Sequence, residues 1–133
     1  MKKHPILYHI ALFSIIFVIA HNVALHLSLY WTTEGYDSIM HTFGGFIGAL
    51  LVIYVVEKIG ISPQTIPKKI ILLLFVMASV IAVGSIWELW EIFVGFTDPF
   101  TDVWDTISDL IMDTIGSIIG FIYYEKKLKS KTE

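Results

Sequence analysis

Residues 70–93, IILLLFVMASVIAVGSIWELWEIF, decide the class of this protein. Residues 70–87 of this stretch carry no charged side chain, and the first charge is that of Glu88. A helix of about 20 largely apolar residues crosses the hydrocarbon core of a bilayer. The stretch therefore predicts a membrane-spanning helix that carries two glutamates, Glu88 and Glu91, close to one end.

Three more segments have the length and the apolar periodicity of spanning helices. They cover about residues 5–30, 38–56 and 103–124. The last of them is more polar, and its helical period identifies it better than its hydropathy does. Gly60, Pro63 and Pro67 separate the second span from the third as turn and helix-stop residues. We therefore expect an all-α fold, a single four-helix transmembrane domain over residues 1–133.

The composition of the whole chain supports this class. Its 133 residues are 56% hydrophobic and 16% charged, whereas soluble domains are about 45–50% apolar and about 25% charged. These values exclude a disordered chain, a nucleic-acid binder with a basic face and a two-domain enzyme. The absence of cysteine excludes disulfides, thiolate metal sites and cysteine nucleophiles. The lipid bilayer is the expected partner.

The basic residues predict the orientation. All of them are lysines, and an even number of spans places them on one side: Lys2, Lys3, Lys58, Lys68, Lys69, Lys126, Lys127, Lys129 and Lys131. The positive-inside rule then places both termini in the cytoplasm. The N-terminal segment also has features of a secretory signal peptide, whose removal would leave three spans in the same orientation. We favour an uncleaved helix, because the apolar stretch is longer than a usual signal-peptide core.

The acidic residues are distributed as unevenly as the lysines. Glu57, Glu125 and Glu133 lie among the lysines. The other nine fall in the outer loops or the outer half of a span: Glu34, Asp37, Glu88, Glu91, Asp98, Asp102, Asp105, Asp109 and Asp113. A charge at membrane depth costs about 2.5–3.5 kcal/mol on insertion scales. We therefore expect these acids to face the bundle interior and to have partners there.

Helical spacing places the outer acids on three facing stripes. The stripes are Asp37, His41, Gly44 and Gly48; Gly84, Glu88, Glu91 and Gly95; and Asp102, Asp105, Asp109 and Asp113, continued by Gly116 and Gly120. Glycines let the helix backbones approach closely. The stripes predict one pocket near the outer surface, with Asp113 deepest. Its expected members are His26, Asp37, His41, Glu88, Glu91, Asp105 and Asp109.

Several carboxylates in such a pocket need a counter-charge. Two unit charges 4 Å apart repel by about 4 kcal/mol at an effective dielectric constant of 20. The chain has no arginine, and its lysines lie at the opposite ends of the helices. An imidazolium, shared protons or a metal cation can supply the balance. Partly protonated acids that hydrogen-bond the helices together are the structural alternative.

We favour one or two divalent metal ions. Carboxylates suit Mg, Ca or Mn, and imidazole ligands also admit Fe or Zn, so the sequence does not distinguish these metals. The expected ligands are Asp37, His41, Glu88, Asp105 and Asp109, with His26, Asp102 and Asp113 as further candidates. Glu91 is the expected catalytic base. Asp102 or Thr101 is also expected to cap the fourth spanning helix.

Three motifs resemble those of the YjdF-like inner-membrane proteins and, more sparsely, those of the VanZ-like proteins. They are YDSIMHTFGG at residues 36–45, ELWE at 88–91, and DVWDT at 102–106 followed by Asp109 and Gly116. The match covers about residues 36–120, and Asp113 departs from it where an apolar residue is expected. The resemblance implies a multi-pass protein of a bacterial or archaeal cell membrane, and the VanZ-like association with glycopeptide-antibiotic resistance points towards the cell envelope. It implies no particular reaction.

Three functions are compatible with the outer carboxylate cluster. In the first, a metal-dependent membrane enzyme uses the ion to polarise a phosphoryl or carbonyl oxygen, or to activate water, on a lipid or lipid-linked envelope substrate. In the second, the same acids serve a cation or proton transporter or channel, although the inner halves of the spans carry no acids to continue a path. In the third, the metal stabilises a structural membrane module. Each of the three functions is compatible with a homo-oligomer.

Overall fold

The computed structural model describes residues 5–60 and 66–129, and its regular elements there are all helical. They are α1 (Pro5–His26), α2 (Leu29–Thr32), α3 (Tyr36–Lys58), α4 (Ile66–Val94), α5 (Val103–Tyr123) and η1 (Tyr124–Leu128), a π-helical turn that continues α5. In this part of the chain, α1, α3, α4 and the continuous α5–η1 helix are long and apolar enough to cross a membrane. The predicted all-α fold with four spans is confirmed.

Two helix boundaries differ from the expected ones. The first helix ends at His26, because Ser28 adopts a left-handed conformation with φ of 57° that an α-helix cannot continue. The chain then forms the short helix α2. Pro67, expected to stop a helix, instead lies in the first turn of α4, where its missing N–H group needs no partner. Pro63, Lys2, Lys3, Lys131 and Glu133 lie outside the described residues.

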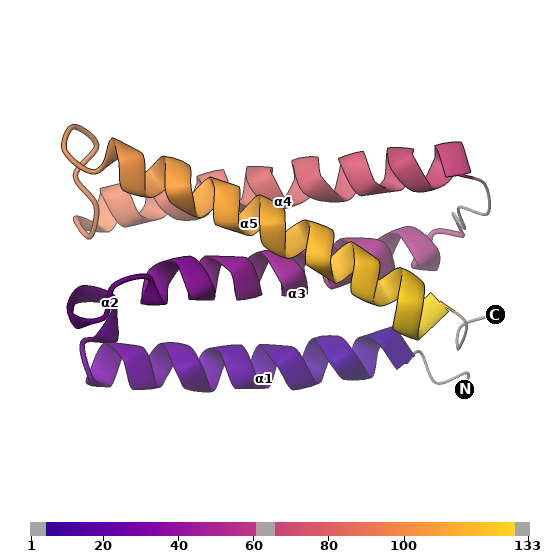
Figure 1. Cartoon of the computed structure of the whole chain (residues 1–133), viewed down its shortest axis with the longest axis horizontal. Coiled ribbons are helices and arrows are strands. Elements are labelled where there is room, and N and C mark those ends of the chain that lie inside the picture. The colour runs from indigo at the N-terminus through magenta and orange to yellow at the C-terminus, as the bar shows by residue number, and fades with distance from the viewer. Residues whose placement is uncertain (1–4, 61–65, 130–133) are drawn as a thin grey trace.

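Helix α3 is the centre of the bundle and contacts α1, α4 and α5. Helix α5 crosses α3 diagonally, so that it lies near α4 at one end and reaches towards α1 at the other (Figure 1). We call the end that holds α2 and residues 95–102 the acidic end. The opposite end, where Lys58 and Lys69 lie, is the basic end (Figure 1).

Glycines make the crossing of α3 and α5 unusually close. A Cβ atom at Gly45 would collide with the backbone carbonyl of Asp113, and one at Gly116 would collide with that of Thr42. Small residues at a crossing let two helix backbones touch within a membrane. The glycine stripes of α3 and α5 therefore meet, and this contact fixes how far each helix slides along the other.

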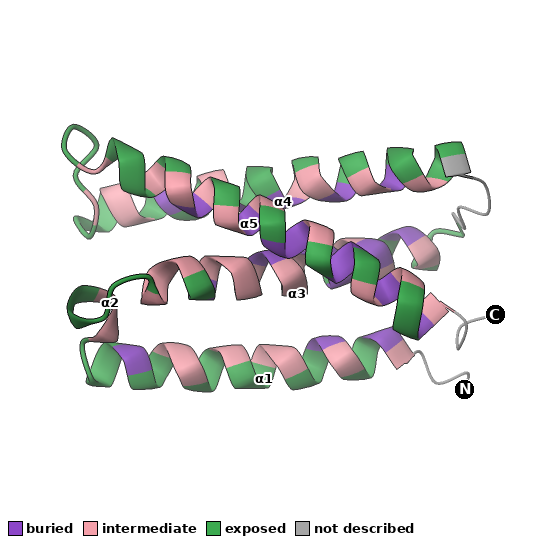
Figure 2. Ribbon diagram, viewed as in Figure 1, coloured by how far each residue is buried: buried purple, intermediate pink, exposed green. Residues whose placement is uncertain are grey.

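Buried residues follow this crossing, while the outer faces of the bundle are exposed (Figure 2). The apolar core lies towards the basic end and includes Leu50, Ile53, Val76 and Tyr124. Large apolar side chains on the outside include Ile15 and Ile19 of α1 and Leu74 of α4. Such faces suit contact with lipid chains, as expected for membrane-spanning helices.

Candidate metal centre

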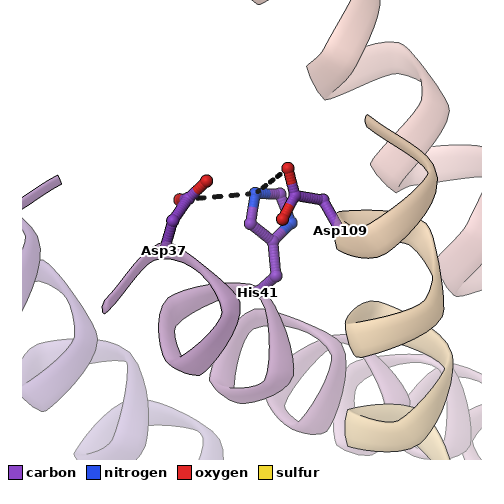
Figure 3. Close-up of side chains that lie close together, drawn as sticks. All are labelled: Asp37, His41 and Asp109. Carbon is purple, nitrogen blue, oxygen red and sulfur yellow. Dashed lines mark ion pairs between the residues drawn. The ribbon is translucent and has the colours of Figure 1, made fainter. Parts of the chain in front are cut away.

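His41 lies among four carboxylates contributed by three helices. Its Nε2 atom is 3.7 Å from Oδ1 of Asp37, 3.8 Å from Oδ2 of Asp109 and 4.0 Å from Oε1 of Glu88. Its Nδ1 atom is 3.4 Å from Oδ1 of Asp113. Figure 3 shows Asp37 and Asp109 on either side of the Nε2 edge of the ring. We call these five residues the His41 cluster.

Helical spacing and the glycine crossing together build this cluster. Asp37 and His41 are one turn apart on α3, and Asp109 and Asp113 are one turn apart on α5, so each pair shares one helix face. The contact at Gly45 brings the two faces together. The third helix, α4, contributes Glu88, which sequence analysis placed on the same type of stripe.

Most of the cluster is shielded from its surroundings. Asp109, Glu88 and Asp113 are 2%, 4% and 6% exposed, whereas the side chain of Asp37 is 37% exposed. The cluster is therefore closed towards the middle of the bundle and open at Asp37, on the side of the acidic end.

Glu88 presents an unsatisfied polar atom to this enclosed space. Its Oε1 is buried and has no hydrogen-bond partner within the described residues. The other such carboxylate oxygen, Oε2 of Glu57, lies at the basic end, where Oε1 of the same group accepts a hydrogen bond from Tyr124. Buried polar atoms in folded proteins are nearly always hydrogen-bonded, so the position of Glu88 calls for a ligand or a proton.

The spacing of these atoms suits a shared cation better than direct hydrogen bonds. One atom each from Asp37, His41 and Asp109 lies within 4.8 Å of the others. Distances of 3.7–4.0 Å from Nε2 exceed the hydrogen-bond range. Tetrahedral ligands of one metal ion at about 2.0–2.2 Å lie about 3.3–3.6 Å apart, so these side chains would have to close by a few tenths of an ångström around an ion. The Asp37–His41–Asp109 group could therefore hold a metal ion.

Glu91 lies one turn beyond Glu88 on α4, towards the acidic end, and is half-buried. Nε1 of Trp87 donates a hydrogen bond to its Oε1 at 2.9 Å, and the hydroxyl of Thr97 donates to its Oε2 at 3.4 Å. Its carboxylate is therefore held in one orientation beside the cluster. It does not belong to the group around His41.

The remaining candidate residues lie apart from His41. Asp105 is exposed on α5, and His26 is exposed at the end of α1; in the described part of the chain neither forms an ion pair with the cluster. Asp102 occupies the N-cap position of α5, but its side chain accepts hydrogen bonds from the Asp98 backbone N–H and the Thr101 hydroxyl. The expected side-chain cap by Asp102 or Thr101 is therefore wrong, because both side chains close the preceding loop instead.

Helix α2 adds a tyrosine that is not among the site residues expected from the sequence. The Tyr30 hydroxyl lies 2.7 Å from Nδ1 of His21. Burial, aided by the charges of Asp37, Tyr36 and Glu91, raises the pKa of Tyr30 to about 12. Tyr30 is thus within electrostatic reach of the open side of the cluster. The sequence carried no signal for this placement, because the left-handed turn at Ser28 brings α2 back over α1.

The fold and the cluster define a class: a four-span membrane protein with a buried His/Asp group that could bind a metal ion. A family model described as "Predicted membrane protein (DUF2238)" matches residues 2–130. The chain belongs to this family, and the match is consistent with the YjdF-like resemblance. No curated protein and no solved structure gives a significant match.

Proposed function

We propose that the His41 cluster binds a divalent metal ion and that the protein is a metal-dependent enzyme for a lipid or lipid-linked envelope substrate. The proposed ligands are Asp37, His41, Glu88 and Asp109. The observation that carries the proposal is Oε1 of Glu88, which is buried without a hydrogen-bond partner and faces Nε2 of His41 at 4.0 Å. Asp105 is left out of this ligand set because it is exposed.

The charge of the cluster supports a bound cation. A single imidazolium would balance one of the four carboxylates, and within the described residues the cluster has no lysine in ion-pair contact. Burying an unpaired charge costs several kcal/mol per ion. A divalent ion would offset two negative charges and would give Oε1 of Glu88 the partner that it lacks within the described residues.

An apolar groove supports a lipid as the substrate. The groove has a volume of about 440 Å³ and lies between α1, α3 and α5, where it is lined by Phe13, Ser38, Ile39, Thr42, Phe43, Phe46, Met112 and Ile119. Its wall is apolar even at Thr42, whose hydroxyl donates to the Ser38 carbonyl. Ser38 and Thr42 directly follow Asp37 and His41 along α3, so the groove runs beside the same two turns of α3 as the cluster, about 100° further around the helix.

The bound ion would act on the headgroup as a Lewis acid. It would polarise a phosphoryl or carbonyl oxygen or activate a water molecule. The nearby Glu91 carboxylate, oriented by Trp87, would accept the proton. We further propose that the acidic end faces the outside of a prokaryotic cell membrane, with both termini in the cytoplasm, because Lys58, Lys69 and Lys126 lie at the basic end.

The core beneath the cluster favours a fixed site over a transport path. Ala49, Leu50, Ile53 and Ser117 are buried between the cluster and the basic end. Within the described residues, the next acid along α3 is Glu57. An ion moving through the bundle would therefore have to cross a packed layer that is apolar except for Ser117.

Elemental analysis of the protein purified in detergent tests the metal centre. We expect at least one divalent ion per chain in the wild type, and loss of the ion in His41→Ala and in Asp109→Asn. Glu34→Gln is the matched control, because Glu34 is an exposed acid of the acidic end. A wild type that holds no metal and takes up neither zinc nor manganese contradicts the proposal.

Proteoliposomes made from bacterial membrane lipids test the activity. We expect metal-loaded wild type to change the lipid composition measured by mass spectrometry, and His41→Ala and Glu91→Gln to leave it unchanged. An unchanged composition together with a His41-dependent ion flux would replace the enzyme by a transporter. An unchanged composition without flux would favour a metal-stabilised structural module.

A further inference from the structure

We propose that Asp113 positions His41 by accepting a hydrogen bond from its Nδ1–H group, so that Nε2 is the nitrogen that binds the metal. This inference rests on the proposed metal centre and assigns Asp113 a different role from that of Asp37, Glu88 and Asp109. Asp113 is a positioning residue and not a ligand.

The two nitrogens of His41 have different surroundings. Among the residues that the structure describes, Nε2 faces three carboxylates at 3.7–4.0 Å, whereas Nδ1 forms an ion pair with Asp113 alone, at the shorter distance of 3.4 Å. A neutral imidazole carries its proton on one nitrogen and has a free lone pair on the other. With the proton on Nδ1, the lone pair points into the group of three acids.

This arrangement is the usual one around a metal-bound histidine. Such histidines almost always donate their second ring N–H to a carboxylate, a carbonyl or a water molecule, which fixes the ring and raises its basicity. Because the two ring nitrogens point in different directions, an ion bound by Nε2, Asp37 and Asp109 would lie away from the Asp113 side of the ring. The group that could hold a metal ion accordingly contains Asp37, His41 and Asp109.

Glycines on two neighbouring helices fix the position of Asp113. A Cβ atom at Gly84 of α4 would collide with Oδ2 of Asp113, and one at Gly45 of α3 would collide with its backbone carbonyl. Asp113 is therefore packed against both helices and is only 6% exposed. A carboxylate held in this way can keep the imidazole in one orientation.

NMR of the wild-type protein, with isotope-labelled histidine and bound cadmium, tests the assignment without any substitution. We expect scalar coupling between cadmium and Nε2 of His41, and a proton retained on Nδ1. Coupling between cadmium and Nδ1 would overturn the proposal while leaving the metal centre intact. A wild type that binds neither cadmium nor zinc would overturn both.

Zinc titration of variants gives the second test. We expect Asp113→Asn and Asp113→Ala to bind zinc about 10–100-fold more weakly. X-ray absorption should show the same number of zinc ligands as in the wild type, because no ligand has been removed. Glu34→Gln, the exposed control, should bind zinc like the wild type. Unchanged affinity in the Asp113 variants, or the loss of one oxygen ligand from the zinc, would overturn the positioning role.

Discussion

The carboxylates at the two ends of the bundle have different charged partners. At the basic end, the Glu125 carboxylate forms ion pairs with Nζ of Lys69 at 2.7 Å and with Nζ of Lys129 at 3.1 Å. Oε1 of Glu57 accepts a hydrogen bond from the Tyr124 hydroxyl at 2.5 Å, whereas its Oε2 has no hydrogen-bond partner within the described residues. At the acidic end, four carboxylates surround His41, and no lysine joins them in the described part of the chain.

This difference is the one that the proposed metal centre would explain. The lysines compensate the charge of Glu125, so its ion pairs join α4 to the end of α5–η1 without any other component. When all four carboxylates of the His41 cluster are ionised, one imidazolium balances only one of them, and an unbalanced buried charge destabilises a fold. Violations of this kind are expected at functional sites, where stability is sacrificed for binding.

The largest expected effect comes from separating α3 and α5, which would disperse the cluster. In Gly45→Ala, the new methyl group would overlap the Asp113 backbone carbonyl, which cannot rotate away. We expect a loss of unfolding free energy of about 3 kcal/mol or more and loss of metal binding. Thermal unfolding in detergent and zinc titration would measure both.

Gly44→Ala is the matched control for this prediction. Its methyl group would lie 3.8 Å from Cε2 of Phe17, which is an ordinary van der Waals contact. We expect unfolding at or slightly above the wild-type temperature, because alanine favours the helix over glycine. Equal behaviour of the two variants would contradict the close crossing.

Metal removal should destabilise the acidic end and leave the basic end unaffected. A ligand at 100 times its Kd stabilises a fold by about 2.7 kcal/mol. We therefore expect the wild type to unfold at a lower temperature after treatment with a chelator, and to recover on addition of zinc. His41→Ala should not respond to zinc, whereas His26→Ala, which changes an exposed histidine, should respond like the wild type. A zinc response in His41→Ala would place the ion elsewhere.

Glu88→Gln should have effects of opposite sign with and without metal. Without metal the substitution removes one of four mutually repelling charges, so the unfolding temperature should rise. With zinc it removes a ligand, so the stabilisation by zinc should fall. Each change should amount to about 1–3 kcal/mol, the range for a buried group that loses or lacks its partner. A shift of the same sign in both conditions would exclude Glu88 from the metal site.

The smallest effect is expected at the basic end. Glu125→Gln breaks the ion pairs with Lys69 and Lys129, which are partly exposed, so the cost should be at most about 1 kcal/mol. The metal content should not change. Loss of metal in this variant would show that the two ends are coupled and would remove the contrast between them.

The sequence was sufficient for the class of fold and for the helix faces that carry the acids. Residues 70–87 are uncharged over the length of a span, which fixes the environment of α4. The spacing of Asp37 and His41 by one helical turn fixes their common face, whatever the rest of the chain does. These properties are local, so they can be read from residue order.

Tertiary structure decided which members of each stripe meet. Asp105, Asp109 and Asp113 share one face of α5, but that face alone does not say which of them lies at the depth of His41. The contacts at Gly45 and Gly116 set the position of α5 along α3, and they place Asp109 and Asp113 beside the imidazole while Asp105 remains exposed. The depth at which two helices cross depends on backbone contact between segments far apart in the chain, which helical periodicity does not contain.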